Sequence, residues 1–327
     1  MRRPIESAIC ERAPLSSGTP IAVGRAWSPC HLKSGGMTDH SAEAFGVDML
    51  VLSREPLPGG FSDATKTRLR AVLNEDGRRV ERTLLLKQTS SVEVAALTAA
   101  SQVPAADAVP ELIDAGQNSN GPYIVTPFYE ATPARHEKTL QANAIETLAR
   151  LRAHYLNRPV AQAIPVVDPD WWRTKCDVSM QRLGALERPI ARLLQAQVKA
   201  FRDEPKMISA LEQMPRTLIH GDIHRNNVLV DNDGQGHIID WGGAFIGAPA
   251  LDLPNLGGPD SPGYRTYIAA WQEITGQALD DDLGWHQSFL AATVWVNIKY
   301  LAFATKIFGD QKGQSMMTRA TDTLNQL

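Results

Sequence analysis

The stretch Thr217–Asp240 constrains the fold of this chain more than any other part of the sequence. It reads T-L-I-H-G-D-I-H-R-N-N-V-L-V-D-N-D-G-Q-G-H-I-I-D, and two short apolar runs, V-L-V and H-I-I, flank a D-N-D-G-Q-G turn. This pattern predicts a β-hairpin. Polar residues stand just before the first strand and just after the second, so the hairpin brings Asp222, Asn227 and Asp240 to one end.

Carboxylate and amide oxygens gathered at one end of a hairpin suit Mg²⁺, a hard cation that keeps waters and shares phosphate oxygens with its protein ligands. Asp222 lies five residues before Asn227, at the start of the same loop. Protein kinases use a similar order, in which a loop Asp takes the substrate proton, an Asn binds metal and a later Asp holds Mg²⁺. The alternative interpretation is an ordinary surface hairpin with acidic ends.

The motif H-G-D-x-x-x-x-N followed by I-D-W resembles the aminoglycoside phosphotransferase and choline kinase family, a branch of the protein-kinase-like fold. The resemblance implies that Asp222 is the catalytic base and that Asn227 and Asp240 bind the metal. The later run G-A-P-A-L-D-L also resembles the family. By the same resemblance, three residues give the catalytic loop its structural support: His220, Gly221 and Asp252.

The resemblance predicts an α+β fold with two lobes, a small antiparallel β N-lobe over residues 46–128 and a larger, mainly helical C-lobe over residues 129–327. Residues 1–45 hold four prolines and no strong periodicity, so we expect a partly ordered extension there. The patterning of the N-lobe favours strands at 47–53, 67–73, 83–88, 112–115 and 123–127, with a serine-capped helix at 90–101. The C-lobe pattern favours helices at 139–158, within 170–212, at 261–275 and at 283–308, around one small sheet.

Several N-lobe residues are expected to bind the nucleotide. Lys87 ends the third strand and Glu93 lies in the next helix, which is the arrangement that holds the α- and β-phosphates in the kinase fold; a solvated lysine at a strand end is the alternative. Gly59 and Gly60 form a turn whose backbone N–H groups can approach phosphates, and Ser62 can donate its hydroxyl. In T-P-F-Y-E, the resemblance implies that adenine binds the carbonyl of Pro127 and the N–H of Tyr129.

Other features leave alternatives open. His224 fits loop packing better than proton transfer, because Asp222 already fills the base role. The D-D-D run at 280–282 precedes a helix with Trp295 and Tyr300, so its carboxylates suit either a cationic substrate or the positive end of the helix. Arg152 stands where relatives often have His.

The predicted activity is transfer of the γ-phosphate of ATP, with Mg²⁺, to a hydroxyl group of a small molecule, as in an aminoglycoside or antibiotic phosphotransferase. A choline or amino-alcohol kinase, a sugar kinase and a secondary-metabolite kinase are the alternatives. A protein kinase would need an A-P-E activation segment, and G-A-P-A-L-D-L follows Asp240 directly instead. A catalytically dead binding protein conflicts with the intact set of Lys87, Asp222, Asn227 and Asp240.

Composition excludes several other classes of protein. The 327 residues carry a net charge of −3, and the pI is near 6.3, so no basic field points to nucleic acid or an anionic membrane. The three cysteines are widely spaced and fit neither a disulfide framework nor a zinc site. No run approaches 18 apolar residues. We therefore expect a cytoplasmic protein that is a monomer or weak dimer.

Overall fold

The structure is a computed structural model, and it describes residues 45–58, 64–134, 139–279 and 283–327. The chain divides into two compact units, Met1–Ala42 and Glu43–Leu327. The first unit lies outside the described residues, and with it almost all of the expected N-terminal extension. Every element named below belongs to the second unit.

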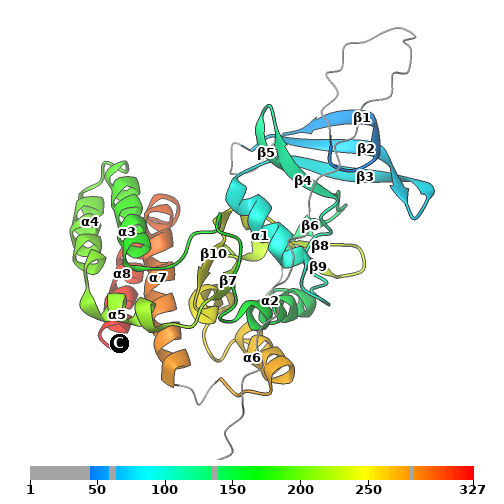
Figure 1. Cartoon of the computed structure of the whole chain (residues 1–327). Coiled ribbons are helices and arrows are strands. Elements are labelled where there is room, and N and C mark those ends of the chain that lie inside the picture. Colours follow the sequence, from blue (N-terminus) through cyan, green and yellow to red (C-terminus); the bar gives the residue numbers. More distant parts are fainter. Residues whose placement is uncertain (1–44, 59–63, 135–138, 280–282) are drawn as a thin grey trace, which may run out of the picture. The chain divides into compact units, whose positions relative to one another are not determined.

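An antiparallel sheet of five strands forms the first part of that unit, in the order β1-β2-β3-β5-β4 (Figure 1). Its strands are β1 (Met49–Leu57), β2 (Lys66–Glu75), β3 (Arg78–Gln88), β4 (Asp114–Asn118) and β5 (Gly121–Pro127). The β2–β3 loop has two residues, Asp76 and Gly77, both with positive φ, which is the geometry of a tight hairpin turn. β1 continues beyond the predicted end at Ser53, because it is an edge strand that pairs with β2 as far as Leu57.

Alternation along β3 decides which side chains face the rest of the molecule. Leu84 and Leu86 point into a small core with Tyr123 and Val125 on the same face. The intervening positions, including Lys87, therefore point to the opposite face. Helix α1 (Ser91–Ser101) begins directly after β3, where the Ser90 hydroxyl accepts a hydrogen bond from Glu93 N at 3.2 Å and caps the helix.

The predicted hairpin is present as β8 (Val228–Val230) and β9 (Gly236–Ile238), which pair antiparallel. The expectation of one small C-lobe sheet is wrong. β6 (Thr132–Pro133) joins the hairpin in a three-stranded sheet, while β7 (Thr217–Ile219) and β10 (Phe245–Gly247) form a second sheet. Both new pairings involve strands of two or three residues, which are too short to show a period of two.

Helices make up most of the remaining chain. They are α2 (Ala142–Tyr155), α3 (Pro169–Gly184), α4 (Pro189–Arg202), α5 (Pro205–Gln213), α6 (Pro262–Thr275), α7 (Leu283–Phe308) and α8 (Asp310–Leu324). Four of these begin with a proline whose missing N–H costs nothing in the first turn. α7 packs against α3, α8 and the 3₁₀ stretch Pro249–Leu256 (Figure 1). α8 was not predicted.

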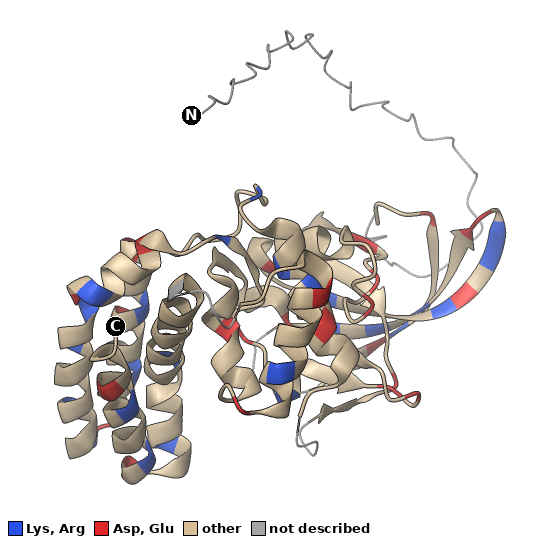
Figure 2. Ribbon diagram, turned by 90° about the horizontal axis from the view of Figure 1, so that it is seen from below, with Lys and Arg blue, Asp and Glu red and all other residues tan. Residues whose placement is uncertain are grey.

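Charged residues of both signs are interspersed along the elements (Figure 2). On the β2–β3 hairpin they pair across strands, as in the contacts of Arg70 with Glu81 and of Arg82 with Glu75. Within the described ranges, none of the helices combines the length and the apolar character that crossing a membrane would require.

Candidate active site

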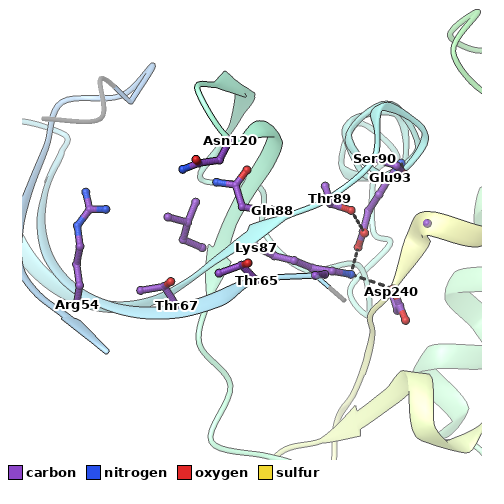
Figure 3. Close-up of a pocket in the computed structure, with 13 residues that line it drawn as sticks. Arg54, Thr65, Thr67, Lys87, Gln88, Thr89, Ser90, Glu93, Asn120 and Asp240 are labelled. Carbon is purple, nitrogen blue, oxygen red and sulfur yellow. Dashed lines mark hydrogen bonds and ion pairs between the residues drawn. The ribbon is translucent and has the colours of Figure 1, made fainter. Parts of the chain in front are cut away.

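Lys87 lies at the centre of a buried ion-pair group at the end of β3. Its ammonium donates hydrogen bonds to Glu93 Oε1 at 2.8 Å and to Asp240 Oδ1 at 2.9 Å. Glu93 comes from the first turn of α1 and Asp240 follows β9, so three separate stretches of chain meet here (Figure 3). The exposed fractions of Lys87 and Glu93 are 7% and 2%, whereas the side chain of Asp240 is 45% exposed.

Lys87 remains protonated although it is buried. Desolvation lowers the pKa of the ammonium, but the carboxylates of Glu93 and Asp240 raise it by more, so the net pKa lies above the usual value. Glu93 also accepts a hydrogen bond from the Thr89 hydroxyl, which fixes the carboxylate. The lysine is therefore a positioned positive charge at a place where the partly exposed Asp240 leaves one side open.

Two cavities adjoin this group. The first has a volume of about 770 Å³, and its lining includes Thr67 of β2, Lys87 of β3 and Asp240. The second, of about 470 Å³, is mostly apolar and extends from Lys87 toward Ile124 and Tyr129. Sizes of this order are typical of small-molecule sites. Together they offer an apolar surface beside a fixed cation, which suits a flat ring joined to an anionic group.

Asp222 and Asn227 are joined within one loop. The Asn227 amide donates to the Asp222 backbone oxygen at 2.9 Å and to Asp222 Oδ2 at 3.3 Å. His220 Nδ1 accepts from Asp222 N at 3.3 Å, and its Nε2 lies 3.0 Å from Ile239 O. The imidazole thus ties the loop to the chain that follows β9, and burial lowers its pKa, which favours the neutral ring.

Gly221 occupies a conformation that only glycine accepts here. Its φ is +79°, in the left-handed region, and a Cβ at this position would collide with the carbonyl oxygen of Gly243. Its N–H donates to Asp252 Oδ2 at 3.0 Å, and the same oxygen lies 3.3 Å from the Arg152 guanidinium. Arg152 and Asp252 are each 1% exposed, so a buried ion pair supports the loop from behind.

The carboxylate of Asp222 is held by residues from α7. Lys299 Nζ lies 2.6 Å and the Tyr300 hydroxyl 2.5 Å from Asp222 Oδ1, and Lys299 also donates to Gly221 O at 2.5 Å. His224 Nε2 is 3.5 Å from the second oxygen. Burial raises the pKa of Asp222, but the contacts with His224, Lys299 and Tyr300 outweigh it and hold the pKa well below its usual range.

The donor set fits a magnesium ion that also binds phosphate. The amide nitrogen of Asn227 is committed to Asp222, so the amide oxygen is the atom that Asn227 can offer to a cation. Asp240 uses Oδ1 for Lys87 and is half-exposed, which leaves Oδ2 for a cation. In the part of the chain that the structure describes, no three His, Cys, Asp or Glu side chains form a metal cluster. A hard cation that takes most of its ligands from water and phosphate matches this sparse set.

Other residues expected in the site lie partly inside and partly outside the described chain. Pro127 and Tyr129 line the 470 Å³ cavity, and the Tyr129 ring stacks on His237 with centroids 3.9 Å apart. Gly59, Gly60 and Ser62 lie outside the described residues, and so does the D-D-D run at 280–282.

Sequence reasoning missed Lys299 and the supporting role of Arg152 in this site. One signal could have indicated Lys299, because it is the sole charged residue between positions 287 and 305 of an otherwise apolar helix. A charge in such a run needs a partner, and Asp222 supplies it from 77 positions away.

Comparison with known proteins gives one family and a common fold. A family model described as the phosphotransferase enzyme family matches residues 56–288. No curated protein matches the sequence. A thermostable mutant of the aminoglycoside phosphotransferase APH(4)-Ia, in a ternary complex with ADP and hygromycin B, is 15% identical over 84% of this chain and 94% of that chain, with a TM-score of 0.50.

Two further solved structures are similar. Spectinomycin phosphotransferase APH(9)-Ia, in complex with ADP and spectinomycin, is 14% identical over 86% of this chain and 95% of that chain, with a TM-score of 0.50. Choline kinase LicA from Streptococcus pneumoniae is 14% identical over 85% and 94%, with a TM-score of 0.49. The family model and the first two likenesses confirm the predicted α+β, two-lobe kinase-like fold.

Proposed function

This chain belongs to the phosphotransferase enzyme family, and from that membership we propose that it transfers the γ-phosphate of magnesium-bound ATP to a hydroxyl group of a small molecule. The observation that carries the proposal is the meeting of Lys87, Glu93 and Asp240 beside a cavity, with Asp222 and Asn227 in the adjoining loop. A fixed cation, an open carboxylate and a separate ionised carboxylate are the parts that phosphoryl transfer needs.

Lys87 would hold the α- and β-phosphates, with Glu93 keeping the ammonium in place. Adenine would lie in the apolar cavity against Ile124, between the carbonyl of Pro127 and the N–H of Tyr129. That N–H has no acceptor within the described part of the chain, which leaves it available. Gly59, Gly60 and Ser62 remain predicted phosphate contacts. Similar folds bind ADP in the APH(4)-Ia and APH(9)-Ia complexes, which supports a nucleotide site.

Asn227 and Asp240 would hold Mg²⁺ through the oxygens that the protein leaves open. When bound, the ion supplies positive charge to phosphate oxygens. Asp222 would orient the acceptor hydroxyl and receive its proton as the oxygen bonds to the γ-phosphorus and the bond to the bridging oxygen of ADP breaks. Because Asp222 is strongly ionised, its main contribution is orientation, and proton transfer follows late in a loose transition state. His220, Gly221 and Asp252 would keep the loop in place.

The acceptor class is open among an antibiotic such as an aminoglycoside, choline or an amino alcohol, a sugar and a secondary metabolite. Structures of similar fold bind hygromycin B and spectinomycin. The lobe boundaries at residues 46–128 and 129–327 also remain proposals.

Calorimetric titration of ATP with and without Mg²⁺ tests the nucleotide site. Wild type should bind MgATP, and Asp240→Ala should lose the magnesium dependence because a metal ligand is removed. Lys87→Met should weaken binding by about tenfold or more, since a charge-assisted contact contributes about 1.5–3 kcal/mol. Lys312→Met, an exposed lysine of α8, is the matched control.

Equal affinity for ATP in EDTA and in Mg²⁺ would contradict the metal assignment. Unchanged affinity in Lys87→Met would place the nucleotide elsewhere. A protein that binds MgATP but phosphorylates no hydroxyl in a broad acceptor screen would favour the non-catalytic binding protein.

A further inference from the structure

A second cationic site lies on the helical side of Asp222. Lys299 of α7 and Lys175 of α3 belong to helices that pack together (Figure 1). Lys175 Nζ lies 5.3 Å from the centre of the Trp171 ring, Trp171 lies 4.6 Å from Trp295, and Trp295 lies 6.0 Å from Lys299 Nζ. The two ammonium groups thus flank one pair of packed indole rings.

In the described part of the chain, Lys175 has no counter-charge of its own. The acidic residues of α3 are committed elsewhere, Asp170 to Arg173 at 2.9 Å and Asp177 to Arg202 at 2.9 Å. Within the described residues, no carboxylate lies at ion-pair distance from Lys175. Burial first, and then repulsion from Lys299 and Arg182, lowers the pKa of Lys175. A half-buried cation repelled by its neighbours is unfavourable unless a ligand supplies negative charge.

Lys299 does not offset the excess positive charge around Lys175. Its contacts are Asp222 Oδ1, Gly221 O and the Tyr300 hydroxyl, and Asp222 is its one carboxylate partner among the described residues. The local charge of Lys175, Lys299 and Asp222 is therefore positive. An amine placed against this surface would be repelled, and an acid would be attracted.

The cationic site is separate from the proposed nucleotide site. No residue of α3 or α7 lines either cavity beside Lys87 within the described chain. Asp222 lines the smaller cavity and also contacts Lys299, so it stands between the two sites. A molecule whose hydroxyl reaches Asp222 from the helical side would meet the charge of Lys299 first, and Lys175 lies close enough to Lys299 to be repelled by it.

We propose that the acceptor is an anionic hydroxyl compound, one that carries a carboxylate, sulfate or phosphate group bound by Lys175 while its hydroxyl lies at Asp222. This inference rests on the proposed function. Lys175 is then a specificity-determining residue, and Lys299 is a positioning residue that orients Asp222 and adds to the attraction.

Three probes with the same sugar ring separate the charge classes: D-glucuronate, D-glucose and D-glucosamine. Binding is followed by calorimetry and by tryptophan fluorescence, because two indole rings lie between the lysines. D-glucuronate should bind at least about tenfold tighter than D-glucose, as expected for one charge-assisted contact. D-glucosamine should bind no better than D-glucose.

Lys175→Met should abolish the preference for glucuronate, Lys175→Arg should retain most of it, and the exposed Lys312→Met should leave it unchanged. Lys175→Met leaves Asp222 and its contacts intact, so it stays informative if Lys299→Met fails to fold. Absence of any Lys175-dependent preference for glucuronate, or tighter binding of glucosamine, overturns the proposal.

The same samples are titrated with MgATP. Saturating MgATP should leave glucuronate affinity within about twofold, whereas direct competition would assign the lysines to nucleotide phosphates and overturn the inference. Normal MgATP binding without a charge preference rejects the anionic acceptor alone. Loss of MgATP binding with the preference intact rejects the proposed function instead.

Discussion

Asp222 is constrained from both sides by residues that the linear sequence keeps far apart. Asn227 holds it from within the loop, and Lys299 and Tyr300 hold it from α7. These contacts hold the carboxylate in one orientation. Its proposed role is therefore separable from nucleotide binding.

Asp222→Asn should reduce kcat by about 10²–10⁴-fold with little change in ATP affinity, because the neutral amide neither orients the acceptor hydroxyl as a carboxylate does nor receives its proton. Asparagine keeps the size and an acceptor oxygen for Lys299 but removes the charge. Single-turnover transfer beside calorimetric ATP binding measures both quantities, and the exposed Asp233→Asn is the control. A variant that transfers phosphate at the wild-type rate would remove Asp222 from the mechanism.

The pH dependence follows from two opposite shifts. Because the pKa of Asp222 is lowered on folding, its ionised carboxylate stabilises the folded state fully above the unfolded pKa of about 3.9. This stabilisation is lost as pH falls through the folded pKa. Because the pKa of Lys87 is raised on folding, its charged ammonium stabilises the folded state fully below the unfolded pKa of about 10.4. This stabilisation is lost as pH rises through the folded pKa. Neither group should change its protonation between about pH 5 and 9, so we expect no change in kcat/KM from either of them in this range. A loss of activity on the acidic side that disappears in Asp222→Asn would contradict this.

Local motifs predicted one half of the site. Lys87 and Glu93 were expected to pair and do so, whereas the contact of Lys87 with Asp240 was not predicted. Lys299 comes from a helix whose contact with the loop has no local signature. Periodicity predicts that a helix has a buried face, but it does not say which distant carboxylate that face will meet.

At the scale of elements, the catalytic loop depends on α2 and on the 3₁₀ stretch that follows β10. Arg152 and Asp252 form a pair that is almost fully buried, yet the Nε and one terminal nitrogen of Arg152 have no hydrogen-bond partner among the described residues. A buried pair with incomplete hydrogen bonding contributes little net stability, but removal of one partner leaves an uncompensated charge.

Asp252→Ala should therefore lower the free energy of unfolding by about 3–5 kcal/mol. The double variant Arg152→Met with Asp252→Ala should lose less than the sum of the two single variants, since no charge is then left unpaired. Urea unfolding measures each value, and the exposed Asp322→Ala is the control. Strict additivity would show that the two side chains do not interact.

The bounds of helices with a clear apolar pattern were predicted closely, whereas a helix without such a pattern was missed. The bounds of α7 agree with the expected 283–308, because its apolar run is long. α8 was missed because its sequence, D-Q-K-G-Q-S-M-M-T-R-A-T-D-T-L, is polar and contains a glycine. Gly313 is there because α8 packs closely on α7, where a Cβ would meet the side chain of Thr305.

At the scale of the whole molecule, the ion pairs of Lys87 connect the five-stranded sheet to the helical part of the chain. A nucleotide bound to Lys87 and Asp240 would strengthen the same connection. Ligand that binds the folded state alone raises stability by mass action.

MgATP at about 100 times its Kd should add about 2.7 kcal/mol and raise Tm by roughly 4–5 °C. Thermal unfolding monitored by tryptophan fluorescence measures the shift at several ATP concentrations. Lys87→Met should show a much smaller shift, while Lys312→Met should match wild type. An equal shift in all three proteins would mean that ATP binds without Lys87.

The collision between a side chain at Gly221 and the carbonyl oxygen of Gly243 has a consequence for heredity. Every missense change that one base substitution can make in a glycine codon installs Ala, Val, Ser, Cys, Asp, Glu, Arg or Trp, and each of these has a Cβ. No single-base missense change at Gly221 should therefore leave the loop that carries Asp222 undisturbed. Lineages that keep the activity should keep this codon as glycine, and a lineage that has lost it should be recognisable by the change.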